Sequence, residues 1–161
     1  MREVSLTQGE VALVDDEEYD RVMAAGPWHL TSTSSTGIHY AQHTGSRPRM
    51  TALLMHRLIL NTQPGQGVDH VNGDGLDNRH VNLRLATKAQ NQANTAKRPG
   101  YTSCYKGVYW DSRRGLWYAH IKLDQRTHFL GRFDSEEDAA GAYDVAARMY
   151  FGEFARTNFQ P

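Results

Sequence analysis

The chain has 161 residues, of which 39% are hydrophobic and 22% charged, and its formal net charge is zero. This composition is typical of a folded globular protein rather than a disordered one. No apolar run reaches the roughly 18 residues that a membrane-spanning helix needs, and the N-terminus lacks the apolar core of a signal peptide. Cys104 is the single cysteine, which excludes an internal disulfide and a cysteine-based zinc site and favours an intracellular compartment.

The zero net charge conceals an uneven distribution along the chain. Between Asn78 and Trp110 the sequence has six basic residues and no acidic one, whereas two basic and six acidic residues follow from Phe133 to the end. The positive middle predicts a polyanionic partner, although a solvated basic face explains the charge alone equally well.

The first 60 residues predict strands with short helices. Residues 4–14 have strand composition, and the acidic start of residues 15–26 favours a short helix that Gly26 and Pro27 end. Aromatic and β-branched runs follow around a Ser/Thr-rich loop at residues 31–37, and a helix is expected near His56.

The segment from Val68 to Leu85 predicts a short strand, a turn-rich loop and a second short strand. Thr87 and Gln90 match a capping box, which predicts a helix over residues 88–97 that Pro99 stops. Residues 99–103 are expected to form a linker between a domain at residues 1–98 and a second one at residues 104–161.

The second domain predicts three strands, at residues 106–111, 116–123 and 126–133, joined by tight turns. Ser135 with three following acids opens a helix that is expected to run to about Phe151. Alternation along residues 117–123 separates a set that suits this alanine-rich helix from an outward polar and aromatic set. The expected fold is a three-stranded antiparallel sheet packed on one helix, so the whole chain is assigned to the α+β class.

Four residues of the segment from Val68 to Asn94 have the chemistry that phosphodiester hydrolysis requires. Histidine is the natural base near neutral pH, which makes His70 the candidate base. Carboxylate and carboxamide oxygens are ligands for hard cations such as Mg²⁺, and Asp69 and Asn91 supply both. Asn82 is able to tie the loop between the two strands through its carboxamide. Asparagine clusters also occur in loops for backbone reasons, so each residue alone is weak evidence.

The runs "VDHVNGDGLDN" and "NLRLATKAQNQAN" resemble the phage and intron-encoded branch of the HNH endonuclease family, whose active site is a ββα-metal motif. The resemblance covers about residues 4–98. It implies that His70 is the general base, that Asp69 and Asn91 are metal ligands, and that Asn82 is the central structural asparagine of the catalytic set. The implied cofactor is a divalent metal, Mg²⁺ or alternatively Mn²⁺.

Residues 104–160 resemble the plant APETALA-type domain, also called the ethylene-response-factor domain, through "GV", "LGRF", "EEDAAGAYDVAA" and the closing "TNF". In that family the sheet binds the DNA major groove. Tyr109, Asp111, His120 and Phe129 depart from the residues that the family has at these positions, so the docking mode is expected to transfer but the plant sequence preference is not. The expected DNA-binding residues are Tyr109, Arg113, Arg114, His120, Lys122, Arg126, Thr127 and Phe129.

The combined prediction is a metal-dependent DNA endonuclease of the homing type, with site preference from the C-terminal sheet. We expect a monomer that nicks one strand of double-stranded DNA in the cytoplasm of a host cell, encoded by a phage or mobile element, with no membrane partner. The alternatives are a non-catalytic DNA-binding transcription regulator and an RNA-binding protein, although the sequence contains no recognisable RNA module.

Overall fold

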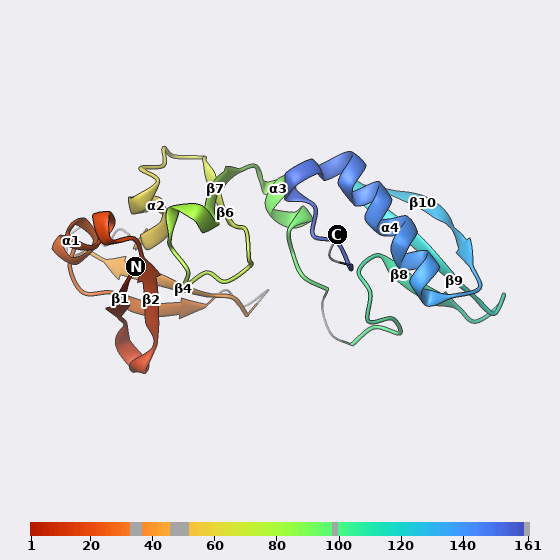
Figure 1. Cartoon of the computed structure of the whole chain (residues 1–161), viewed down its shortest axis with the longest axis horizontal. Helices are drawn as coiled ribbons and strands as arrows, with labels where there is room; N and C mark the ends of the chain where they lie inside the picture. Colours follow the sequence, from red (N-terminus) through yellow and green to blue (C-terminus); the bar gives the residue numbers. More distant parts are fainter. Residues whose placement is uncertain (33–36, 46–51, 98–99, 160–161) are drawn as a thin grey trace. The chain divides into compact units, whose positions relative to one another are not determined.

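The protein is represented by a computed structural model that describes residues 1–32, 37–45, 52–97 and 100–159. It divides into two compact units, Met1–Thr87 and Lys88–Pro161, which Figure 1 colours from red to green and from green to blue. Both units combine helices with small antiparallel sheets, so the predicted mixture of helices and strands is confirmed. Within the described ranges, no helix combines the length and apolar character needed to cross a membrane.

In its described residues, the first unit contains three small sheets and two short α-helices. The strands β1 and β2 form a hairpin, β3, β4 and β5 form an antiparallel sheet, and β6 pairs antiparallel with β7. The expected Ser/Thr-rich loop falls largely outside the described residues. The elements of this unit are β1 (Arg2–Ser5), η1 (Thr7–Gly9), β2 (Val11–Val14), α1 (Asp16–Ala24), β3 (His29–Ser32), β4 (His39–Thr44), β5 (Ala52–Leu54), α2 (Met55–Ile59), β6 (Gly67–His70), η2 (His80–Asn82) and β7 (Leu83–Ala86).

One core holds the first unit together. Val14 on β2, Val22 on α1 and Met55 on α2 are fully buried, and Trp28 donates from Nε1 to the Val22 carbonyl at 2.9 Å. The long loop between β6 and β7 is attached to this core through β2. Leu13 is its anchor point, because its amide donates to the Leu76 carbonyl and its carbonyl accepts from the Asn78 amide. The loop between β6 and β7 is therefore hydrogen bonded to the hairpin of β1 and β2 at the start of the chain.

The second unit contains α3 (Lys88–Ala93), β8 (Val108–Asp111), β9 (Leu116–Leu123), β10 (Arg126–Phe133), α4 (Glu136–Phe151) and η3 (Gly152–Phe154). The strands form an antiparallel sheet in the order β10-β9-β8. Asp124 and Gln125 both have positive φ, which is the geometry of a two-residue hairpin turn. At the start of α4, Ser135 Oγ accepts a hydrogen bond from the Asp138 amide at 2.9 Å, as expected for its N-cap.

The helix α4 lies against one face of this sheet through small side chains. Ala119 and Ile121 of β9 are buried in clusters with alanines of α4 and with Tyr143. Gly107, with φ of +77°, lies so close to the Tyr143 ring that a Cβ there would collide with it. Glycine at this position therefore allows α4 to approach the sheet closely.

The C-terminal tail is fastened to α4 by a buried carboxylate. Asp144 is 2% exposed and accepts hydrogen bonds from Asn158 and from the Phe159 amide. Asn158 in turn accepts from the Lys106 amide at 2.6 Å. Cys104, just before β8, is exposed, and its amide donates to Glu136 Oε1 at 3.2 Å.

The helix α3 is shorter than the sequence predicts. It ends at Ala93 instead of continuing to residue 97, and Pro99 lies outside the described residues. The Thr95 hydroxyl donates back to the Asn91 carbonyl, and Lys106 Nζ donates to the Ala93 carbonyl. These two donors satisfy carbonyl groups at the end of the helix, so the chain turns away there without a proline.

Candidate functional site

Three of the predicted site residues, the metal ligand Asp69 and the catalytic residues His70 and Asn82, lie on neighbouring elements of the first unit. Asp69 and His70 are the last two residues of β6, and Asn82 ends η2, which leads into β7. All three are buried, with exposed fractions of 4%, 6% and 5%. Burying polar side chains lowers stability unless they are hydrogen bonded, so this cluster indicates a built site rather than a solvated loop.

The carboxamide of Asn82 ties the loop between β6 and β7 to the strand ends. Its Nδ2 donates to the Asp77 carbonyl at 2.7 Å, and its Oδ1 accepts from the Asn72 amide at 2.9 Å. Asp77 is itself bound by the Arg79 guanidinium at 2.7 Å. The Asn82 side chain therefore joins two points of this loop, Asn72 and Asp77, to the end of η2.

The carboxylate of Asp69 forms an ion pair across the β6–β7 ladder. Asp69 and Arg84 are paired in register, and the Arg84 Nε and Nη2 atoms lie 2.8 Å and 2.7 Å from Asp69 Oδ2. The Arg84 side chain is 16% exposed, so the pair lies largely out of solvent. Arg84 was not among the predicted site residues, because its pairing with Asp69 depends on the strand register.

The imidazole of His70 lies in a cluster of aromatic rings. Its ring centroid is 5.0 Å from that of His56 on α2 and 5.7 Å from that of Tyr40 on β4, and the latter two rings are 5.5 Å apart. His56 is therefore buried on α2 with its ring packed against the candidate base. Tyr40 gives no signal in the sequence, because only the fold brings its ring against that of His70.

Burial changes the pKa values of all three rings. It lowers the pKa of His56 to about 3, with smaller contributions from the neighbouring His70 and Arg57. Burial also lowers the pKa of His70, although Asn78 and the carboxylates of Asp69, Asp74 and Asp77 oppose this. The pKa of Tyr40 is raised by burial and by Asp69. Near neutral pH the His70 ring is therefore unprotonated, which is the form that accepts a proton.

Asn91 belongs to the second unit. It lies on α3, is partly buried, and its carbonyl accepts from the Thr95 hydroxyl at 3.3 Å. In the part of the chain that the structure describes, no group of three or more His, Cys, Asp and Glu side chains could hold a metal ion. The donor atoms of Asp69 and Asn91 fit a hard cation by their chemistry, because both supply oxygen.

The sheet of the second unit presents a column of stacked rings. The Tyr109 ring lies 4.6 Å from that of His120, with an angle of 7° between the planes, and 5.5 Å from that of Tyr118. Tyr109 and His120 were predicted to bind DNA, and the structure brings them together. Three more of the predicted residues, Lys122, Arg126 and Thr127, are exposed where β9 ends and β10 begins. Lys122 pairs in register with Thr127 there.

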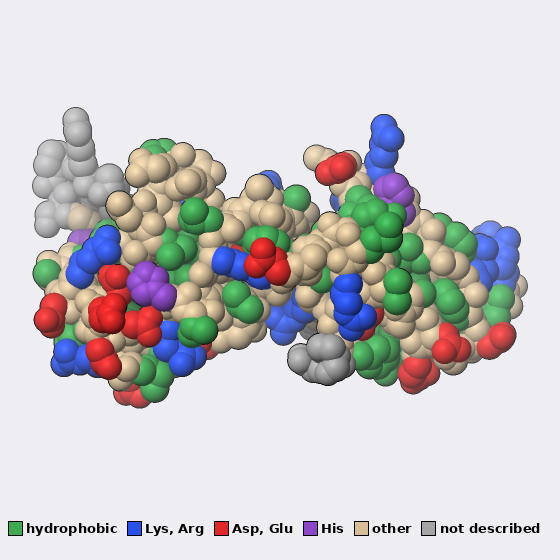
Figure 2. Space-filling view, turned by 45° about the horizontal axis from the view of Figure 1, so that its top comes forward, with side chains coloured by type: hydrophobic (Ala, Val, Ile, Leu, Met, Phe, Trp, Pro, Cys, Tyr) green, Lys and Arg blue, Asp and Glu red, His purple; other side chains and the backbone are tan. Residues whose placement is uncertain are grey.

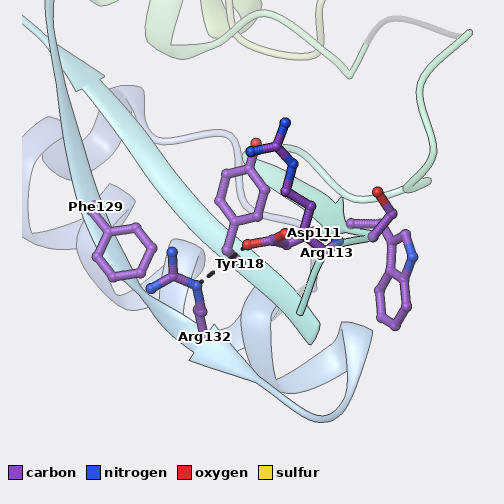
Figure 3. A pocket seen from close by; sticks show the side chains of 7 residues that line it. Asp111, Arg113, Tyr118, Phe129 and Arg132 are labelled. Carbon is purple, nitrogen blue, oxygen red and sulfur yellow. Dashed lines mark hydrogen bonds and ion pairs between the residues drawn. The ribbon is translucent and has the colours of Figure 1, made fainter. Parts of the chain in front are cut away.

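A pocket of about 340 Å³ opens beside this column (Figure 3). Arg113 and Phe129, two of the predicted residues, line it, and Phe129 is 56% exposed next to a break in register on β10. Asp111 lies 3.1 Å from the Arg114 guanidinium and 3.6 Å from the Arg132 guanidinium. The Arg132 guanidinium also lies 4.9 Å from the Phe129 ring centroid.

Asp111 and Arg132 also line this pocket, although neither was among the predicted DNA-binding residues. The sequence did not predict these contacts. Asp111 on β8 pairs with Arg132 on β10, and spacing along the chain does not show that these two strands bring their side chains together. On the face seen in Figure 2, acidic and basic side chains are intermixed over the first unit.

Two family models match the chain. The HNH endonuclease model matches residues 54–93, and the AP2 domain model matches residues 103–153. These ranges follow the order that the sequence predicted, and the first includes Asp69, His70, Asn82 and Asn91.

Similar proteins occur in viruses and plants. An uncharacterized HNH endonuclease, L560, of Acanthamoeba polyphaga mimivirus is 37% identical over 91 residues, which cover 56% of this chain and 46% of that protein. Protein 3.8 of Escherichia phage T7 is 30% identical over 92 residues, which cover 57% of this chain and 75% of that protein. The AP2/ERF and B3 domain-containing transcription repressor TEM1 of Arabidopsis thaliana is 39% identical over 72 residues, covering 45% of this chain and 20% of that protein.

The two viral proteins match 56–57% of this chain, and the plant protein matches 45% of it. The chain spans about half of the mimivirus protein and three quarters of the phage protein. This chain belongs to the HNH endonuclease family, and in it an AP2 domain follows the HNH segment.

Proposed function

We propose that the protein is a metal-dependent DNA endonuclease of the homing type. The observation that carries this proposal is the buried set of Asp69, His70 and Asn82 inside the HNH match, in a chain that continues into an AP2 domain. The AP2 sheet gives the enzyme its site preference, and the enzyme acts in the cytoplasm of the host cell.

His70 is the general base of the reaction. Its buried, unprotonated ring accepts a proton from water as the water oxygen attacks phosphorus. The new P–O bond forms while one ester P–O bond breaks, and the departing oxygen takes up a proton from solvent. The rings of His56 and Tyr40 limit the orientations of His70 by contact, and Asn82 holds the loop beside it.

Asp69 and Asn91 are the proposed ligands of a divalent cation, in the ββα-metal motif that membership of the HNH family implies. The ion is Mg²⁺, with Mn²⁺ as a substitute, because both proposed ligands are oxygens. When bound, such an ion supplies positive charge that stabilises the phosphate and the leaving oxygen. Arg84 keeps the Asp69 carboxylate oriented on β6 through its contacts with Oδ2.

The sheet of the second unit is the proposed surface for duplex DNA. Basic side chains of the β8–β9 turn bind phosphate oxygens, which carry no sequence information, whereas groups on the strands contact base edges. The proposed contacts are Tyr109, Arg113, Arg114, His120, Lys122, Arg126, Thr127 and Phe129. The plant relative carries the word repressor in its name, but the HNH segment favours cleavage over regulation alone for this chain.

The chain has one Asp-His-Asn-Asn set and therefore one hydrolytic centre. Duplex strands run antiparallel, so one centre has to be repositioned to cut the second strand. We propose a monomer that nicks one strand.

The test compares His70→Ala with His80→Ala on supercoiled plasmid DNA, with and without Mg²⁺. His80 is a matched control, because it is half exposed and its ring lies against Glu18 at 3.1 Å. We expect the wild type and His80→Ala to nick, and His70→Ala to bind DNA within about twofold but not to cut, since one general base typically contributes 10²–10⁴-fold. A wild-type protein that binds DNA but never cuts would instead identify a DNA-binding regulator.

A further inference from the structure

The helix that carries Asn91 is built into the DNA-binding unit. The compact second unit begins at Lys88, so α3 belongs to it although the HNH match continues to residue 93. Ala93 and Asn94, at the end of α3, are 5% and 8% exposed. The helix contacts α4 and η3, which are both parts of this unit. These contacts hold α3 against the domain at the end that follows Asn91.

A partly buried cation, Lys106, fastens this end of the helix. Lys106 Nζ donates to the Ala93 carbonyl at 2.5 Å. Burial lowers the pKa of Lys106 to about 8, Arg156 lowers it further, and Asp144 opposes the shift. A cation at the C-terminal end of a helix is favourable, because the last carbonyl groups have no partner within the helix. The position of Lys106 is itself fixed, because its amide and carbonyl are both bonded to Asn158.

The segment between α3 and β8 is attached to the sheet as well. The Lys97 ammonium lies 4.6 Å from the Tyr101 ring centroid and 4.9 Å from that of Tyr109. The Tyr101 ring meets the Tyr109 ring edge-on at 6.1 Å. Thr102 accepts a hydrogen bond from the Trp110 amide at 3.4 Å. The described part of the expected linker thus packs on β8 instead of spanning open solvent.

We propose that Lys106 is a positioning residue, which holds the α3 helix and with it Asn91 on the DNA-binding domain. This inference rests on the proposed function, in which Asn91 is a metal ligand. When the sheet docks on its site, Asn91 is brought to a fixed place relative to the recognition sequence. Recognition and cutting are then coupled through Lys106, and the cut falls at one phosphodiester instead of being spread over several.

The test compares Lys106→Met with Arg148→Met in the full chain. Methionine keeps the apolar stem of Lys106 and removes its donor. Arg148 is exposed on α4, so its variant is a control for the loss of one positive charge from the same unit. Hydrogen exchange of the α3 and α4 amides is measured without metal, and DNA binding is measured by fluorescence anisotropy. Single-turnover cleavage of an end-labelled duplex then gives the rate and the position of the cut.

We expect Lys106→Met to raise amide exchange in α3 by about tenfold or more, as loss of a hydrogen bond to a charged group typically does, with α4 exchange unchanged. DNA affinity stays within about twofold, while cleavage slows and the cut position spreads, because binding contacts remain and only positioning is lost. Lys106→Arg, which keeps a charged donor, restores α3 protection and the single cut position.

Two results would overturn the proposal. One is unchanged α3 exchange in Lys106→Met, and the other is a loss of DNA affinity parallel to the loss of cleavage, which would make Lys106 a DNA contact. If α4 also loses protection, the domain has unfolded, and Tyr101→Ala then tests the same attachment through the segment on β8. A wild type that does not cut would refute the proposed function alone, because amide exchange in α3 still decides whether Lys106 anchors the helix.

Discussion

The buried His56 predicts that acid destabilises the first unit. Its pKa is about 3 in the folded protein and 6.5 in an unfolded chain. Between these values the unfolded state binds a proton that the folded state does not bind, so the free energy of unfolding falls as the pH is lowered. The contribution is fully present above pH 6.5 and is progressively lost as the pH falls towards 3.

The size of the effect follows from the same two pKa values. Each unit of difference corresponds to about 1.4 kcal/mol, so the loss is about 2 kcal/mol at pH 5 and about 4 kcal/mol at pH 3. A typical domain has only about 5–15 kcal/mol of stability, so this one ring makes the first unit strongly sensitive to acid. His56→Phe keeps a ring against Tyr40 and His70 but removes the titration.

The measurement is urea unfolding between pH 4.5 and 7.5, in wild type and His56→Phe, in a background where Trp110 and Trp117 are replaced by phenylalanine. Fluorescence then reports on Trp28, which is 3% exposed in the core of the first unit. The two proteins differ only at residue 56, so the difference between the two curves reports on His56 and its electrostatic coupling to His70. Parallel curves over this pH range would refute the assignment of a neutral, buried His56.

Three further outcomes are expected. Gly107→Ala should destabilise the second unit by about 3 kcal/mol or more, because its Cβ collides with Tyr143 at a φ of +77°, whereas Gly141→Ala in α4 should be neutral or stabilising in the same thermal melts. Replacing Arg113 and Arg114 should weaken binding on every duplex and reduce the slope of affinity against salt by about one per lost phosphate contact, which titrations at several salt concentrations measure. With the two strands of a duplex site labelled separately, limiting enzyme should cut one strand first, and equal, simultaneous cuts would point to a dimer.

Local patterns predicted the second unit well. The strands β9 and β10 coincide with the predicted ranges, and α4 begins after Ser135 and ends at Phe151 as expected. Each of these elements has its own local signal, such as alternation, a tight turn or a cap, and no distant contact overrides it. The predicted end of α3 was wrong because Lys106, which donates to the carbonyl of the last helical residue, lies 13 positions after that residue, Ala93.

The candidate catalytic residues were named from their order in the motif, but their surroundings were not foreseen. The contacts of His70 with Tyr40 and His56 join β6, β4 and α2, which are separated along the chain. Hydrophobic patterning does not predict contacts between such distant elements. The ion pair of Asp69 with Arg84 depends on the register of β6 and β7, and the sequence of the turn-rich loop between these strands does not determine that register. The candidate residues could therefore be named from residue types and their order, whereas their burial and pKa shifts required the fold.

The single thiol of the chain offers a route to watch the second unit directly. Cys104 is exposed and lies beside Glu136 at the start of α4, so one maleimide dye attaches at one known point without further mutation. Such a dye and a second one on the DNA would form a donor–acceptor pair, whose energy transfer reports docking of the sheet before any bond is cut. The order of binding and cleavage could then be timed on single molecules of the unmodified sequence.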